Sequence, residues 1–279
     1  MDGRSAGKAK LQSPAEDDEA KQPLYAAPAL EKGLDILELL SRQEVGLTRR
    51  DIAEKLGRSV SEIFRMIEVL TRRGYLVQVD DSYIMGMMLF ALAHEFPPMN
   101  RLLKEALPRM DALAKAAGQS CHMTVLNGLR QVVVAQVDPP AAMGFSVKIG
   151  AVLPLLKSAS GRVLLAFQSK DEAKRLMQSA DPDATPEERA AMRSIIAEIE
   201  AQGCAFMPSN QFDGMVAISC PVLDLRGRAI AALTVPYVKR LDEPLSASDE
   251  DVRSMLLETT SSLTAALGGM TSTGRAPHV

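Results

Sequence analysis

Apolar side chains recur every three or four residues in three separate segments of the first third of the chain. The first segment predicts an amphipathic helix from Ala29 to Ser41, and the second predicts a shorter helix from Thr48 to Leu56. The third predicts a helix that starts at Ser59 or Ser61. Its apolar face has the spacing i, i+3, i+4 and i+7, at Ile63, Met66, Ile67 and Leu70. Together the segments indicate a small domain built on three helices.

The second and third helices are joined in the way that a helix-turn-helix requires. Thr48 can accept a backbone N–H at the start of the second helix, and Gly57 can supply the left-handed residue that ends it. The other face of the third helix is polar, with Ser61, Glu62, Arg65 and Glu68. In such a pair the first helix braces the second, which can then enter the major groove of DNA.

A hairpin is predicted after the third helix, with strands at residues 74–79 and 83–85 and a turn between them. It adds a wing to the helix-turn-helix. Helix pairs joined through glycine also occur in all-α domains, but the charge favours DNA binding. Residues 49–73 hold seven basic and four acidic side chains, a local net charge of +3 in a chain whose net charge is −3.

The pattern changes after the wing. Residues 87–96 predict an almost uncharged helix, closed by Pro97 and Pro98, which we interpret as a linker and a dimer contact. A helix ended by Gly118 follows, with Pro108 as a kink or a break. Beyond it strands are predicted at 120–126, 131–137, 145–156, 215–224 and 228–238, and helices at 160–167, 171–178, 186–202 and 248–267. The first two strands flank Asn127-Gly128, a hairpin signal. The order predicts an α+β domain without a parallel sheet.

Composition limits the number of domains, the cellular location and the cofactors that we expect. The 279 residues are 47% apolar and 24% charged, which is typical of a soluble protein of two domains. Neither a signal peptide nor an apolar run of about 20 residues is present, so we expect a cytoplasmic protein without a membrane partner. The cysteines are Cys121, Cys204 and Cys220, and their spacing predicts buried thiols with no metal site, disulfide framework or cofactor.

An enzyme is disfavoured by the same residues. Cys121 and His122 are neighbours that would point to opposite faces of a strand, and the chain carries no nucleophile motif and no glycine-rich phosphate loop. Two alternatives stay open at this point. The second domain could process a small molecule, or the protein could be an architectural DNA binder that ignores ligands.

Four blocks of sequence resemble the IclR family of bacterial transcription regulators. They are LEKGLDILELL, the helix-turn-helix with GYL after it, the segment from Gly150 through SASGRVLLAF, and DGMVAISCPVLDLRGRAIAALTVP. The resemblance implies a winged helix-turn-helix at 29–86, a linker helix at 87–98 and a GAF-like effector-binding domain at 99–270, between disordered tails at 1–28 and 271–279. It further implies a homodimer or a dimer of dimers on double-stranded operator DNA. The family typically controls catabolic operons in response to small aromatic, keto or sugar-derived acids.

The DNA-binding residues expected from this arrangement lie around the helix-turn-helix. They are Thr48, Arg49, Arg50, Arg58, Ser59, Ser61, Glu62 and Arg65. An arginine can read guanine with two hydrogen bonds or can pair with a phosphate, and for Arg65 we favour the phosphate. Arg49 and Arg50 are expected to contact the DNA backbone and set the register.

The effector-binding residues are expected around a small-residue loop before a helix. There the backbone N–H groups of Ser158, Ala159, Ser160 and Gly161 could hold a carboxylate, although a plain serine cap with close packing at Gly161 explains the same residues. The further candidates are Met143, Phe145, Ser146, Asp213, Ala217, Thr234 and Pro236. Relatives commonly have tyrosine, an acidic residue and cysteine where this chain has Cys204, Met207 and Ala217. We therefore expect a more apolar pocket without an acidic anchor.

Overall fold

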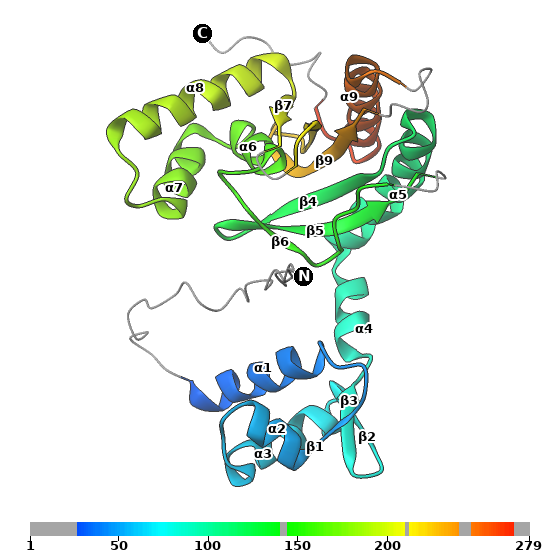
Figure 1. Cartoon of the computed structure of the whole chain (residues 1–279), viewed down its shortest axis with the longest axis vertical. Coiled ribbons are helices and arrows are strands. Elements are labelled where there is room, and N and C mark those ends of the chain that lie inside the picture. Colours follow the sequence, from blue (N-terminus) through cyan, green and yellow to red (C-terminus); the bar gives the residue numbers. More distant parts are fainter. Residues whose placement is uncertain (1–26, 140–143, 210–211, 240–246, 271–279) are drawn as a thin grey trace, which may run out of the picture. The chain divides into compact units, whose positions relative to one another are not determined.

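The computed structural model describes residues 27–139, 144–209, 212–239 and 247–270 (Figure 1). The chain divides into two compact units between Glu95 and Phe96, and each unit is described by itself. Most of the predicted N-terminal tail and the whole of the predicted C-terminal tail lie outside the described residues. None of the described helices is long and apolar enough to span a membrane.

The first unit is a three-helix core with a small sheet. Its elements are α1 (Pro28–Leu40), β1 (Leu47–Thr48), α2 (Arg49–Lys55), α3 (Val60–Arg72), β2 (Leu76–Val79), β3 (Ser82–Met85) and α4 (Met88–Glu95). Ile36, Ile52, Ile63 and Ile67 are fully buried between the three helices, with Tyr83 of the wing beside them. The predicted winged helix-turn-helix is therefore confirmed.

Local chemistry fixes the boundaries of this unit. Thr48 caps α2 with a reciprocal capping box to Asp51, and Gly57 has the left-handed φ of +63° that the turn requires. Sequence reasoning missed β1, whose Leu47 pairs with Tyr83 in the antiparallel sheet β1-β3-β2. Two residues are too few for an alternating pattern to reveal a strand.

The predicted linker helix is present as α4, and none of its side chains is buried. It ends at Glu95, one residue before Phe96. Pro97 and Pro98, which were expected to close it, are the first residues of the next helix, where a missing N–H costs nothing.

The second unit holds the remaining elements. They are α5 (Pro97–Ala117), β4 (Cys121–Asn127), β5 (Arg130–Val137), β6 (Val152–Pro154), α6 (Ala159–Ala166), α7 (Lys170–Ala180), α8 (Pro186–Gln202), β7 (Ala205–Pro208), β8 (Met215–Leu223), β9 (Ala229–Val238) and α9 (Asp249–Ala266). The strands form a six-stranded sheet in the order β6-β5-β4-β9-β8-β7, and every pairing is antiparallel. The predicted α+β class is confirmed.

Helices cover both faces of this sheet (Figure 1). α5 and α9 pack against one face, with Met110, Leu113, Leu256 and Leu263 in the core between them and the strands. α6, α7 and α8 build a second core on the other face, which we call the α6 face. Successive strand residues point to opposite faces, so each strand contributes to both cores.

Four details differ from the sequence prediction. Of the strand expected at 145–156, the structure has β6 alone, because the chain turns at Gly150 with φ +83°. Sequence reasoning missed β7 altogether. α5 continues through Pro108 without a break. The hairpin turn falls on Gly128 and Leu129, one position later than expected.

Candidate DNA-binding surface and effector site

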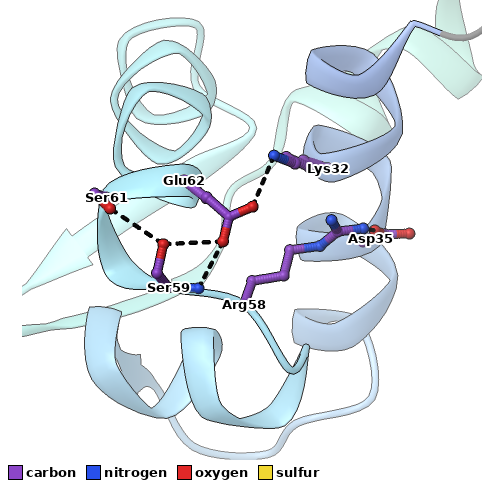
Figure 2. Close-up of polar contacts among 6 residues, drawn as sticks. All are labelled: Lys32, Asp35, Arg58, Ser59, Ser61 and Glu62. Carbon is purple, nitrogen blue, oxygen red and sulfur yellow. Dashed lines mark hydrogen bonds and ion pairs between the residues drawn. The ribbon is translucent and has the colours of Figure 1, made fainter.

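The start of α3 is held by a reciprocal cap (Figure 2). The backbone N–H and the hydroxyl of Ser59 both donate to Glu62 Oε2 at 2.9 Å. Glu62 Oε1 pairs with Lys32 Nζ of α1 at 3.1 Å. The hydrogen bond from the Ser59 backbone, followed by those from its hydroxyl and from Lys32, lowers the pKa of Glu62 to about 2. Glu62 is thus an ionised tie between α3 and α1.

A second ion pair joins the same two helices. Arg58, directly before the cap, places Nη2 2.7 Å from Asp35 Oδ2 of α1 (Figure 2). Both side chains stay partly exposed, at 31% and 40%. Arg58 therefore has a partner within its own unit, and the two pairs together fix the N-terminus of α3 against α1.

Arg49 ties α2 to α3 and to the wing. Its Nε donates to the Tyr83 hydroxyl at 2.7 Å, and its Nη2 pairs with Glu68 at 3.2 Å. The guanidinium also lies 4.9 Å from the ring centre of Phe64, a cation–π contact. This cluster makes Arg49 a part of the scaffold between the two helices.

Three of the predicted DNA-binding residues remain open at the surface. Arg50, Ser61 and Arg65 are exposed, and within the part of the chain that the structure describes neither arginine has a carboxylate within 4.0 Å. Phe64, which the sequence prediction missed, is 41% exposed on the same helix. The outward face of α3 thus presents a hydroxyl, a cation and an aromatic ring.

A cavity of about 290 Å³ lies beside the start of α2. Its lining residues come from the start of α2 and from the wing, and they are Thr48, Arg49, Arg50, Gln78, Asp81 and Tyr83. The free N–H groups and positive dipole of a helix N-terminus favour an anion such as a phosphate, and Arg50 adds a full charge. The carboxylate of Asp81 in the wing opposes the binding of an anion.

A row of buried polar side chains crosses the α6 face of the large sheet. His122 of β4 lies opposite Thr234 of β9, and Thr234 lies opposite Ser219 of β8. The hydroxyls of Thr234 and Ser219 are 2.8 Å apart. We call these three residues the polar row; each is at most 5% exposed. α6 packs against all three strands, so the row lies beneath it.

Several predicted effector residues gather around this row. Ala217 lies directly opposite Pro236, two positions along the strands from Ser219 and Thr234, and on the same face. Phe145 stacks edge-on against Phe212, with ring centres 4.8 Å apart, and its carbonyl accepts the Ser120 hydroxyl. The sequence prediction missed Phe212.

Other predicted effector residues lie apart from the row. Ser146 and Asp213 are exposed in the loop before β6 and in the turn before β8. Met143 falls outside the described residues. The structure therefore brings part of the predicted set together and leaves these side chains at the surface.

The small-residue loop is the first turn of α6, which begins earlier than expected. Ser158 is its N-cap and accepts the N–H of Gly161 at 3.2 Å. Gly161 packs against the carbonyl of Leu155 with no room for a Cβ. Ala159 and Ser160 are each 2% exposed. The cap and the close packing are thus both present, and the N–H groups of Ala159 and Ser160 lie at the positive end of the helix.

Buried polar atoms without partners mark the same face. Within the described part of the chain, His122 Nδ1, Thr124 Oγ1 and Gln131 Oε1 are buried and make no hydrogen bond. Burial lowers the pKa of His122 to about 4, so the ring is neutral at physiological pH. Gln131 Nε2 bonds to Ser158, next to the start of α6. Orphaned buried atoms are rare and require an explanation, and a bound ligand is one.

A separate cavity of about 330 Å³ lies between α6, α7 and α8. Among its lining residues are Lys157, Arg162, Lys174 and Met192. It shares no residue with the polar row or with the predicted effector set. The nearby basic side chains were not singled out from the sequence.

Most of the site residues that sequence reasoning missed contact predicted site residues that lie far away along the chain. Lys32 and Asp35 lie three residues apart on α1, and the packing of α1 against α3 brings them to Glu62 and Arg58. His122 had been set aside as half of a disfavoured catalytic pair. No sequence signal distinguishes a buried strand histidine beside a ligand from one in a plain core.

A helix-turn-helix with an exposed basic face, joined to an α+β unit with a buried polar row, defines a DNA-binding regulator with a ligand-binding domain. Two family models match the chain: the IclR helix-turn-helix domain at residues 29–80, and the bacterial transcriptional regulator IclR C-terminal domain at residues 99–262. The chain belongs to the IclR family of transcriptional regulators, which combine a DNA-binding helix-turn-helix with an effector-binding C-terminal domain.

Individual relatives span almost the whole chain. The HTH-type transcriptional regulator XynR of Escherichia coli is 28% identical over 248 residues, which cover 86% of this chain and 97% of XynR. HmgR of Pseudomonas aeruginosa is similar in structure, with a TM-score of 0.67, 25% identity, and coverage of 88% and 100%. An IclR homologue of Microbacterium hydrocarbonoxydans, crystallised with 4-hydroxybenzoate, has a TM-score of 0.70 at 21% identity and covers 86% and 99%.

Proposed function

We propose that this protein binds an operator as a homodimer or a dimer of dimers and controls a catabolic operon in response to a small aromatic, keto or sugar-derived acid. The observation that carries the proposal is the polar row beneath α6, with the orphaned Nδ1 of His122 on the same face. A regulator without an effector has no use for unpaired polar atoms in its core, because each one costs about 1 to 3 kcal/mol.

On the DNA side we assign two roles to the predicted residues. Arg50, Ser61 and Arg65 are exposed and are proposed to contact DNA directly, the arginines through phosphates. The others act by positioning α2 and α3 through the caps and ion pairs of the domain; they are Thr48, Arg49, Arg58, Ser59 and Glu62. Binding should therefore depend strongly on salt.

On the effector side we propose that the acid lies between the start of α6 and the polar row. Its carboxylate would take the N–H groups of Ala159 and Ser160, and its other polar groups would meet the neutral His122 and Thr234. Ala217, Pro236 and Phe145 would supply apolar contact, in keeping with a pocket that lacks an acidic anchor. The 4-hydroxybenzoate in the Microbacterium homologue is one reason to test aromatic acids.

The dimer is proposed on the exposed apolar side chains of α4 and of the residues beside it. Met87 is 78% exposed and Phe90 is 63% exposed, which is unusual for large apolar side chains in water. A second copy of the chain would cover them. Replacing Phe90 by Ser should shift the purified protein toward monomer in sedimentation, and an unchanged assembly would remove α4 from the interface.

Thermal unfolding of the full chain tests the effector proposal. A compound that binds the folded protein at 100 times its Kd stabilises it by about 2.7 kcal/mol, so a true effector raises the Tm with concentration. We expect this from one class of the acid panel, and expect Thr234→Val to lose most of the shift. If no compound shifts the Tm of the wild type, the effector proposal fails, and if Thr234→Val responds fully, the site is wrongly placed.

A further inference from the structure

Cys204 and Cys220 face each other at the junction of α8 and β7. Ala205 of β7 lies opposite Ser219 of β8, so one step further along the strands Cys204 lies opposite Cys220. Both side chains are fully buried. Directly opposed residues of antiparallel strands have Cα atoms about 4.5 to 5.5 Å apart, within the range of about 4.4 to 6.8 Å that a disulfide spans.

The two sulfur atoms have unequal surroundings. Arg253 of α9 donates from Nε to Cys204 Sγ at 3.0 Å, while its Nη1 pairs with Glu250 at 3.0 Å. The Cys220 hydrogen bond and then Arg253 lower the pKa of Cys204 to about 6, against burial and the charge of Glu250. Burial, and then Cys204 itself, raise the pKa of Cys220. Arg253 thus favours the thiolate form of Cys204, whereas burial favours the protonated thiol of Cys220.

A small cavity has Cys204 among its lining residues. It holds about 90 Å³ and lies between α6, α8 and β7, with Gln202, Cys204 and Met207 among its lining residues. A water molecule occupies about 30 Å³ of liquid, so the cavity can admit a molecule of the size of hydrogen peroxide.

We propose that Cys204 and Cys220 form a peroxide-reactive dithiol that closes reversibly into a disulfide between β7 and β8. The Cys204 thiolate attacks one peroxide oxygen, the O–O bond breaks, and a sulfenic acid and hydroxide form. The Cys220 sulfur then attacks the sulfenic sulfur, the S–O bond breaks, and the departing hydroxide takes the Cys220 proton as water. A proton from solvent converts the first hydroxide to water, so in sum one thiolate and one thiol lose two electrons and hydrogen peroxide becomes two waters.

In a reducing compartment such a bond is transient, which is the usual state of intracellular disulfides with a sensing role. Cys121 supplies a contrast within the same chain. It is buried in the core beside α5, where burial raises its pKa to about 12. It should therefore stay a thiol under conditions that oxidise the other two.

Peptide mass spectrometry of the reduced, full-length protein tests the proposal. After brief exposure to one equivalent of hydrogen peroxide at pH 7, denaturation and alkylation, we expect a linked peptide pair containing Cys204 and Cys220. Dithiothreitol should restore both thiols, and Cys121 should be fully alkylated throughout. Equal alkylation of all three cysteines, or equal oxidation of all three, would overturn the proposal.

Variants separate the two roles. In Cys220→Ser, dimedone should trap a sulfenic acid on Cys204, whereas Cys204→Ser should yield neither a disulfide nor an adduct. Arg253→Gln should move the midpoint of the oxidation rate upward from about pH 6, because the thiolate loses its cation. Oxidation of Cys204→Ser at the wild-type rate would reject Cys204 as the reactive thiol. The wild-type result does not depend on how these variants fold.

Discussion

The neutral ring of His122 is the most informative single side chain of the effector domain. It lies in the middle of a sheet, opposite Thr234, and burial holds its pKa at about 4. A histidine in an unfolded chain titrates near 6.5. The folded state therefore binds its proton more weakly, and protonation favours unfolding.

This gives a prediction for stability against pH. The contribution of His122 is fully present above about pH 6.5 and is lost as the pH falls from there toward 4, by about 1.4 kcal/mol per unit and roughly 3 kcal/mol in all. Urea unfolding of the wild type and of His122→Gln should diverge over that window, with the variant showing the flatter profile. Parallel profiles would mean that folding leaves the pKa of His122 unchanged.

Arg65 is predicted to contact a phosphate. Arg65→Ala should weaken binding to operator and to random DNA by similar factors, and should reduce the slope of log K against log salt by about 1. Arg226→Ala, which removes an exposed arginine from the turn between β8 and β9, is the matched control and should change neither. A loss confined to the operator would indicate instead that Arg65 reads a base.

Arg58 is predicted to act through Asp35, its ion-pair partner 2.7 Å away. Arg58→Ala and Asp35→Ala should each lower the free energy of unfolding by less than about 1 kcal/mol, as partly exposed pairs do. In a double-mutant cycle on operator affinity, removing Arg58 should have little further effect once Asp35 is gone. Full additivity would show that Arg58 contacts DNA by itself.

At the scale of elements, the helix boundaries are set by capping residues that lie next to them in the sequence. Thr48, Ser59, Thr185 and Ser248 each begin a helix with a capping box, and Gly118 ends α5 with a left-handed φ of +63°. Such signals act within a few residues, so the sequence alone predicts them. The order of helices and hairpins was predictable for the same reason.

Long-range features were not predictable in this way. β1 and β7 are short strands defined by partners far along the chain, Tyr83 for Leu47 and Ser219 for Ala205. The polar row forms only because three strands pair in one particular register. The ion pairs of Arg49 with Glu68 and of Arg58 with Asp35 form only when the helices pack together. Contacts between residues far apart along the chain produce no regular spacing of residue types that a single sequence could reveal.

The start of α6 gives a prediction about packing. Gly161→Ala would place a methyl group against the carbonyl of Leu155, and we expect the free energy of unfolding to fall by about 1 to 3 kcal/mol. Gly33→Ala, within α1 and with nothing within 4 Å of the new Cβ, should instead stabilise by about 0.5 to 1 kcal/mol. Chemical denaturation of both variants checks the sign. A neutral Gly161→Ala would remove close packing as the reason for this glycine.

At the scale of the molecule, the family membership and the two units define a regulator whose DNA affinity we propose is set by an effector. An effector that binds two states of the protein with different affinity shifts their populations. A coupling of about 1 to 3 kcal/mol would change operator affinity about 5- to 150-fold. A DNA affinity that depends on the effector requires both the exposed cations of the first unit and the polar row of the second.

The most direct test is fluorescence anisotropy with DNA from the intergenic region upstream of the coding sequence, with and without aromatic, keto and sugar acids, at two salt concentrations. We predict tighter binding than to random DNA, a shift with one class of acid in the wild type, and the loss of that shift in Thr234→Val with DNA binding intact. Binding no tighter than to random DNA, or operator binding that no acid in the panel alters, would contradict an effector-gated regulator.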